Sequence, residues 1–268
     1  IVGALSKSAI FPFHFWLPGA MAAPTPVSAY LHAAAMVKAG IYLIARLSPA
    51  FADTPFWRPT LITLGVFTML LGGFQALRER DLKRILAFGT VSQLGFLTVM
   101  LGFGTRDAAL AGAALLLSHA LFKSCLFLVV GVIDRQLSTR DIGELSGLGR
   151  QAPVMATASF LAIGSMAGVI PTLGFVAKET ALTALWHEAT AGSPWGIVAL
   201  LGIVVGSALT AAYGIRFLWG AYWTKRDVER TEWPDPPIGF LASPVLLAGA
   251  SLALGFLAPI VDHWLAPY

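Results

Sequence analysis

The sequence has 268 residues, of which 57% are hydrophobic and only 12% are charged. A soluble globular domain carries about 25% charged residues. This shortage of charge, with a mean hydropathy of +0.75, excludes an ordinary soluble domain and predicts a membrane protein. The net charge of +4 does not predict nucleic-acid binding, because the basic residues lie in short loops between apolar runs. We also expect no cofactor and no metal site, since the single cysteine, Cys125, lies inside an apolar run.

The chain opens inside an apolar run without an initiating methionine, and we expect it to be a fragment of a longer protein. Pro12 and Pro18 argue against one straight helix over residues 1–22 and predict a discontinuous span. Pro26 suits the first turn of a following span, which is expected to run to about Arg46. Charged, Gly or Pro clusters end the further spans. These spans are predicted at roughly 60–77, 83–103, 108–133, 153–187, 195–222 and 240–262.

The pattern therefore predicts an all-α polytopic membrane protein of about seven to eight spans. One of them, residues 153–187, is too long for a simple span and contains the sequence IPTLG at 170–174. Pro171 and Gly174 would free backbone groups there, and such groups need a protein or water partner inside a bilayer. A broken helix of this kind is the usual pointer to a transporter site.

The loops at 78–84, 134–150 and 223–237 hold most of the loop lysines and arginines. The opposite side has only Arg46, Arg58 and Arg106. The positive-inside rule therefore predicts that the first set of loops is cytoplasmic, in a multi-pass protein of the cell inner membrane. The basic residues of these three loops are Arg78, Arg80, Lys83, Arg84, Arg135, Arg140, Arg150, Lys225, Arg226 and Arg230.

Several ionisable residues remain inside the predicted spans, where each central charge costs about 2.5–3.5 kcal/mol on insertion scales. Structural need seldom explains so many. Burial disfavours the ammonium form of a lysine, so a row of such lysines, linked by histidine and water, could carry protons. His119 and Lys123 are four residues apart and share one helix face, whereas His32 and Lys38 would line different parts of one path. The candidates for proton translocation are Lys7, His32, Lys38, His119, Lys123, Lys178 and Glu179.

Four long stretches of the sequence resemble the antiporter-like membrane subunits. This superfamily includes the A subunit of Mrp-type sodium/proton antiporters and subunit 5, or L, of respiratory complex I. The resemblance covers essentially the whole chain, and four motifs in the same order make it specific. The stretches are KSAIFPFHFWLPGAMAAPTPVSAYLHAAAMVKAGIYLIARL, DLKRILAFGTVSQLGF, SHALFKSCLFLVVGVIDRQLSTRDI and SMAGVIPTLGFVAKETAL.

The resemblance implies a helix bundle with two inverted five-helix repeats, each with one discontinuous helix. Residues 1–47 would then end the first repeat, and residues 48–222 would form the second. Residues 223–268 would form a cytoplasmic loop and one additional transmembrane helix.

The family's buried lysine and histidine axis can be carried over by position. Lys7 matches the lysine of the first broken helix, and His32 matches the histidine of the next helix, with Lys38 one to two turns further on. His119 and Lys123 match the histidine and connecting lysine of the second repeat. In the second broken helix, Lys178 matches the lysine that faces the outer exit.

Some positions depart from the family pattern. Leu115 stands where many relatives of the complex I type carry a second histidine, and the glutamate that pairs with the lysine matching Lys7 would lie upstream of this chain. Gly19 and Lys38 resemble the Mrp protein, because complex I proteins usually have Asp and a small or hydroxyl residue there.

Three functions follow from these features. The first is a proton-translocating subunit of a multisubunit sodium/proton antiporter, with other small membrane subunits, the lipid bilayer, protons and monovalent cations as its partners. The second is a non-redox proton-pumping membrane subunit of NADH-quinone oxidoreductase or of a membrane-bound hydrogenase. In the third, the buried lysines are only structural.

Overall fold

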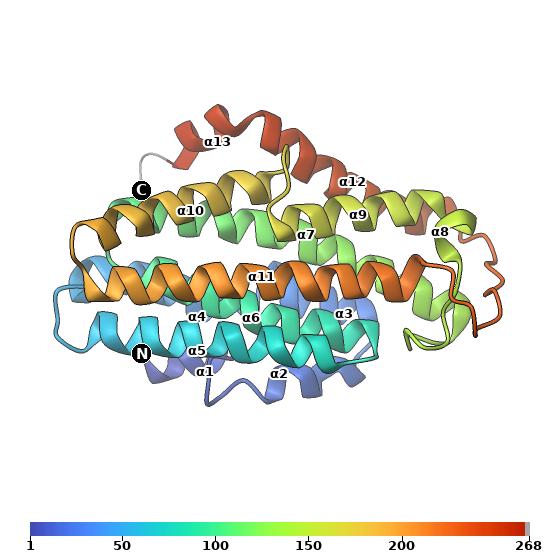
Figure 1. Ribbon diagram of the computed structural model, residues 1–268, viewed down its shortest axis with the longest axis horizontal. Helices are drawn as coiled ribbons and strands as arrows, with labels where there is room; N and C mark the ends of the chain where they lie inside the picture. Colours follow the sequence, from blue (N-terminus) through green and yellow to red (C-terminus); the bar gives the residue numbers. More distant parts are fainter. Residues whose placement is uncertain (266–268) are drawn as a thin grey trace.

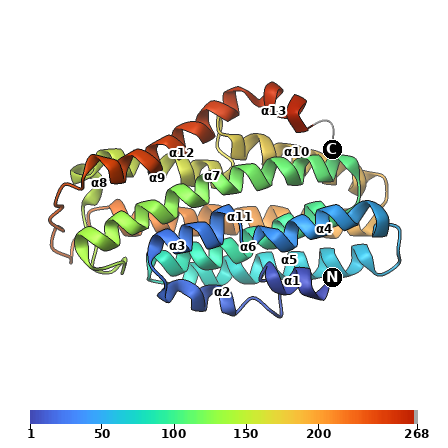
Figure 2. The ribbon, with the colours of Figure 1, turned by 180° about the vertical axis from the view of Figure 1, so that it is seen from behind.

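The computed structural model describes residues 1–265, and Figures 1 and 2 show their arrangement from two opposite sides. Within this part of the chain the structure is helical, apart from turns, loops and one isolated bridge between Asp81 and Asp141. The helices are α1 (Val2–Lys7), α2 (Trp16–Gly19), η1 (Ala20–Ala22), α3 (Thr25–Ala29), η2 (Tyr30–Ala34), α4 (Lys38–Phe51), α5 (Trp57–Arg78), α6 (Leu82–Gly102), α7 (Arg106–Leu137), α8 (Leu148–Gln151), α9 (Pro153–Ala167), α10 (Leu173–Thr190), α11 (Pro194–Tyr222), α12 (Ile238–Phe256) and α13 (Ala258–Leu265).

Six segments of the described chain are long and apolar enough to cross a membrane. The longest helix, α7, has 32 residues, which corresponds to about 48 Å at 1.5 Å per residue and exceeds a hydrocarbon core of roughly 30 Å. The shorter helices α9 and α10 lie end to end along the bundle, so together they cross it once as an interrupted helix (Figure 1). These observations confirm the predicted all-α membrane fold. The six segments are Thr25–Phe51, α5, α6, α7, α11 and α12.

Helix α6 forms the centre of the bundle, and nearly all of its residues are buried. It packs closely on α5 because small residues face each other at the contact. A Cβ atom added to Gly72 would lie 2.6 Å from the Ser92 nitrogen, and one added to Gly95 would lie 2.5 Å from the Gly65 carbonyl oxygen. Small residues at a membrane helix interface allow this close backbone approach. The tight pair gives the bundle a rigid centre against which the other helices pack.

The first predicted discontinuity lies between α1 and α2, where residues 8–15 are not helical. The span expected from Pro26 to about Arg46 differs from the structure, because it is itself interrupted. Helix α3 passes into a π-helical turn, η2, and the regular helix resumes only at Lys38 and continues to Phe51. The Ser8 hydroxyl donates a 2.7 Å hydrogen bond to the Val37 carbonyl and so joins the two irregular segments. Single π-turns often mark functional sites.

The second break lies between α9 and α10, at residues 168–172, close to the expected position at 170–174. Helix α9 is followed by Gly168, whose φ of +88° is a left-handed conformation that favours glycine. The first turn of α10 is held by Ser165, whose hydroxyl oxygen accepts a 3.2 Å hydrogen bond from the Gly174 amide. Pro171 lies within the break, and Gly174 lies in the first turn of α10. A side chain from α9 therefore satisfies one of the amides that the break exposes.

Candidate functional site

Five of the predicted residues are buried inside the bundle on four different elements. His32 comes from η2, Lys38 from α4, His119 and Lys123 from α7, and Lys178 from α10. The two histidines and Lys123 are fully buried, and Lys38 and Lys178 are 8% and 7% exposed. Because isolated charges are rarely buried to this degree, the five residues form the first candidate site.

The three buried lysines are held by main-chain carbonyl groups. The ammonium nitrogen of Lys38 donates to the Leu116 carbonyl at 3.3 Å, and that of Lys123 donates to the Leu86 carbonyl at 3.1 Å. Lys178 donates to the Ala167 carbonyl at 3.2 Å. Within residues 1–265 none of the three lysines forms an ion pair. Carbonyl dipoles, and not acidic side chains, therefore stabilise these ammonium groups.

The middle of the site is a group of four bases around α7. Lys38 reaches from α4 to the Leu116 carbonyl, which lies one turn before His119 on α7. Lys123 follows His119 by one turn on the same face of α7. His32 packs on Phe127 of the same helix, with ring centroids 4.8 Å apart. The structure thus brings together residues from both predicted repeats.

Both ring nitrogens of His32 and of His119 are buried and have no hydrogen-bond partner among the described residues. A neutral imidazole carries one donor and one acceptor, so each ring can form a hydrogen bond on two sides. Buried polar atoms in proteins are normally paired, either with protein or with water. Such rings are suited to relay protons between neighbouring ammonium groups.

The surroundings of Lys123 are shaped by α6 and α11. Its ammonium nitrogen lies 5.9 Å from the centre of the Tyr213 ring on α11. A Cβ atom on Gly89 of α6 would lie 3.0 Å from the Lys123 nitrogen and 2.9 Å from the Tyr213 ring. The absence of a side chain at Gly89 therefore provides the space that the ammonium occupies. One turn further along α6, the Gln93 amide donates to the Thr210 hydroxyl at 3.1 Å.

Lys178 is positioned by the break between α9 and α10. Its hydrogen-bond acceptor, the Ala167 carbonyl, belongs to the last residue of α9 and so to the negative end of that helix dipole. A Cβ atom on Gly168 would lie 2.9 Å from the Lys178 Cδ atom. The interruption thus creates both the acceptor for the lysine and the room for its side chain.

Two predicted residues lie apart from this group. Lys7 is at the end of α1 and is exposed. Glu179 follows Lys178 directly, but neighbouring helical residues point about 100° apart, and Glu179 is exposed on the outer face of α10. Leu115, which stands where many relatives of the complex I type carry a second histidine, is buried.

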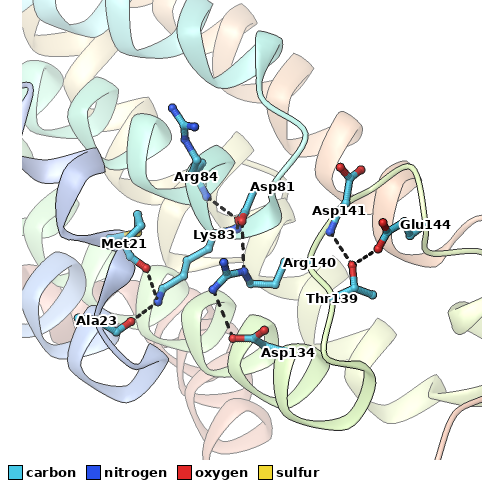
Figure 3. Close-up of polar contacts among 10 residues, drawn as sticks. All are labelled: Met21, Ala23, Asp81, Lys83, Arg84, Asp134, Thr139, Arg140, Asp141 and Glu144. Atoms are coloured by element: carbon cyan, nitrogen blue, oxygen red, sulfur yellow. Dashed lines mark hydrogen bonds and ion pairs between the residues drawn. The ribbon is translucent and has the colours of Figure 1, made fainter.

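Lys83 is not among the predicted site residues, and the sequence pattern counts it with the cytoplasmic loop cations at the edge of a predicted span. The structure places it in the first turn of α6 with its side chain 1% exposed. Its ammonium group donates to the carbonyls of Met21, at 3.0 Å, and Ala23, as Figure 3 shows. A signal was present in the sequence: Asp81, before the apolar run, is a typical N-cap residue. This N-cap makes Lys83 part of the helix.

An ion-pair network joins the start of α6 to the loop after α7 (Figure 3). One Asp81 carboxylate oxygen accepts from the amides of Lys83 and Arg84 at 2.7 and 3.2 Å and so caps α6. The other accepts from Arg140 at 3.1 Å, and Arg140 also pairs with Asp134 at 3.4 Å. Asp81, Asp134 and Arg140 therefore hold the start of α6 against the loop after α7.

Comparison with known proteins places these features in a family. Residues 1–210 match the family described as NADH:quinone oxidoreductase/Mrp antiporter, TM. The chain is 42% identical to the A subunit of the Na(+)/H(+) antiporter of Bacillus subtilis (strain 168), over 98% of this chain and 35% of that protein. The chain therefore spans about a third of that relative's length.

Solved structures show the same likeness. A chain of the Mrp complex from Dietzia sp. DQ12-45-1b is 44% identical, with a TM-score of 0.88 over 98% of this chain and 28% of that one. A chain of respiratory complex I from Thermus thermophilus is 28% identical, with a TM-score of 0.77 over 97% of this chain and 56% of that one. The likeness to the Mrp complex is thus greater in both sequence and fold.

Proposed function

Because the chain belongs to the family of membrane subunits described as NADH:quinone oxidoreductase/Mrp antiporter, we propose that it forms the proton-translocating part of the A subunit of a multisubunit sodium/proton antiporter. One observation carries the proposal: three lysines and two histidines, without an ion-pair partner in the described chain, are buried inside one helix bundle on η2, α4, α7 and α10. Buried ionisable residues in membrane helices are typical of proton relays.

In this proposal protons pass between the lysines by way of the histidines. His119 lies near both Lys38 and Lys123, so its ring can take a proton from one ammonium group on one nitrogen and release another from the second nitrogen. His32, which lies on η2, would exchange protons with Lys123. Lys178, at the break in the second interrupted helix, would deliver protons to the outer side, and water would complete the contact between α7 and α10.

The position of the chain in the membrane is part of the same proposal. We infer that the loops at 78–84, 134–150 and 223–237 face the cytoplasm of a bacterial cell, because they hold most of the loop lysines and arginines. The buried site offers bases, whereas sodium sites prefer oxygen ligands. Other membrane subunits of the antiporter are therefore expected to contribute to cation movement.

A second function is a proton-pumping membrane subunit of NADH-quinone oxidoreductase or of a membrane-bound hydrogenase. The fold likeness to the Thermus complex I chain supports it. The greater identity to the Mrp chain and to the Bacillus protein favours the antiporter. Genes for flavin or iron–sulfur subunits beside this one would reverse that preference.

The test is transport in everted membrane vesicles from a host that lacks its own antiporters, with the whole antiporter complex expressed. We expect Lys38→Ala and Lys178→Ala each to reduce sodium-dependent proton movement by about 10²-fold, the scale of a lost proton-transfer group. Arg226→Ala, at an exposed loop cation, is the control and should transport normally. Wild-type antiport in both lysine variants would refute the proposed relay.

A structural role for the lysines makes a different prediction. Lys123→Met keeps the length of the side chain but removes its charge. If the lysines only hold helices together, this variant should lower the amount of assembled complex and leave the flux per assembled complex unchanged. In the proposed function the flux per complex falls instead.

A further inference from the structure

Helix α10 has an exposed polar face, although the helix lies among apolar membrane spans. Apart from the adjacent pairs 179/180 and 186/187, its exposed residues are separated by three positions, so they share one side of the helix. We call this side the Glu179 face. It consists of Glu179, Thr180, Thr183, Trp186, His187 and Thr190.

The exposed surface of the neighbouring helix α11 has a different composition. This helix runs antiparallel to α10 and packs against it, and each of its exposed residues is apolar. A hydrocarbon environment accepts such a surface but not an ionised carboxylate. The exposed residues of α11 are Pro194, Ile197, Val198, Leu201, Val204, Val205, Ala208, Ala212, Ile215 and Trp219.

Helix lengths place Glu179 at the depth of a hydrocarbon core. A short loop joins α10 to α11, and Glu179 and Val205 each lie eleven residues from the helix ends that meet there. Eleven residues correspond to about 16 Å of helix. The longest helix extends only about 9 Å beyond each side of a 30 Å hydrocarbon core. With the turn between α10 and α11 as far outside the core as the ends of the longest helix, Glu179 would lie about 7 Å inside the hydrocarbon boundary.

Within residues 1–265 no basic side chain forms an ion pair with Glu179. The threonines of α10 are different, because their hydroxyl groups can bond to their own helix. Thr180 donates to the Val176 carbonyl at 2.8 Å, and Thr190 donates to the Trp186 carbonyl at 2.9 Å. The hydroxyl groups of Thr180 and Thr190 can thus tolerate lipid before assembly, whereas an ionised Glu179 carboxylate needs a positive partner. This combination suits a surface that is covered when separately inserted subunits meet.

We propose that the Glu179 face docks a transmembrane helix of another subunit, and that this helix presents a lysine or arginine to the Glu179 carboxylate. Polar side chains join helices in membranes because their alternative partner is hydrocarbon. The charge selects the partner, and the threonines and Trp186 provide the contact area. Glu179 then acts in assembly and lies outside the proton path, while the adjacent Lys178 faces the buried site.

Site-specific photo-crosslinking in the purified complex tests the docking. A benzoylphenylalanine is placed at Thr183, and the matched control position is Leu201, because each lies seven residues from the joined ends of α10 and α11 and both are exposed. We expect Thr183 to crosslink to a different subunit, through a peptide with a lysine or arginine within one helical turn. Leu201 should give no crosslink to protein. A crosslink within the same subunit, none at all, or a partner peptide without a basic residue would overturn the proposal.

Charge removal tests the role of Glu179 itself. We expect Glu179→Gln to lower the recovery of assembled complex at least tenfold, and the flux per remaining complex to stay normal. Thr157→Ala is the control and should assemble normally, since Thr157 is exposed on α9, outside the Glu179 face, and its hydroxyl donates to the Pro153 carbonyl of its own helix. If Glu179→Gln leaves assembly intact but abolishes transport, Glu179 belongs to the proton path and the docking proposal is wrong. The lysine variants test the proton relay separately, so the two proposals can fail independently.

Discussion

The substitution Gly89→Ala places one methyl group where the Lys123 ammonium now lies. The new Cβ atom would be 3.0 Å from the Lys123 nitrogen and 2.9 Å from the Tyr213 ring. The aromatic ring is fully buried and cannot move far, whereas the lysine ends in a flexible chain. The least costly relief is therefore to displace the ammonium group, which also breaks its hydrogen bond to the Leu86 carbonyl.

The expected effect on stability is small because two contributions oppose each other. Overpacking a tight contact costs about 1–3 kcal/mol, and alanine is better than glycine in a helix interior by about 0.8–1.0 kcal/mol. The net destabilisation should be about 0–2 kcal/mol. Transport should nevertheless fall about tenfold or more, since 1 Å misplacements of reacting groups have effects of this size.

Thermal unfolding of the purified protein measures the change in stability. Vesicle transport, normalised to the amount of assembled complex, measures the change in activity. The control is Gly249→Ala on α12, where an added Cβ atom meets nothing within 4 Å. It should be neutral or slightly stabilising, with normal transport. In a variant that already carries Lys123→Met, Gly89→Ala should cost no further transport. Normal transport in Gly89→Ala alone would refute the need for Lys123 in its observed position.

Three further substitutions test the surrounding structure by thermal unfolding. Gly168→Ala should lower the free energy of unfolding by about 1–3 kcal/mol, because alanine must adopt a left-handed conformation and its Cβ atom would clash with the Lys178 side chain. An unchanged melting temperature would contradict this. Asp81→Asn should keep the cap of α6 but lose the ion pair with Arg140, so it should be less destabilising than Asp81→Ala, whose lost cap costs about 1 kcal/mol more. Trp57→Phe removes a buried 3.0 Å hydrogen bond to a carbonyl at the end of α6 and should cost about 1–3 kcal/mol, and a smaller loss would mean that water replaces the indole donor.

The sequence predicted those features of the fold that depend on local composition. The apolar runs predicted the spans, and the IPTLG sequence predicted an interruption next to Lys178, because a proline and a glycine disfavour a continuous helix. The four-residue spacing of His119 and Lys123 correctly placed both on one side of α7, since that relation depends only on helix geometry.

Features that depend on tertiary packing could not be read from the chain. Nothing in the adjacent pair Lys178–Glu179 shows which residue points inward, because that direction is set by the helices packed against α10. The inward path of Lys83 depends on two carbonyls about sixty residues away in sequence. The π-turn at η2 depends in part on its contacts with α7, which no local pattern encodes.

The choice of hydrogen-bond partners separates two kinds of cation in this protein. Arg140 is paired with two carboxylates at the end of the bundle, where a fixed charge stabilises the loop after α7. A carboxylate beside a buried lysine would likewise favour its charged form and leave an unpaired anion if the proton left. Lys38, Lys123 and Lys178 are bonded to neutral carbonyls, which accept a hydrogen bond from either the ammonium or the neutral amine. Each of these lysines can therefore release its proton without leaving a buried counter-charge behind, as a relay requires and a structural ion pair does not.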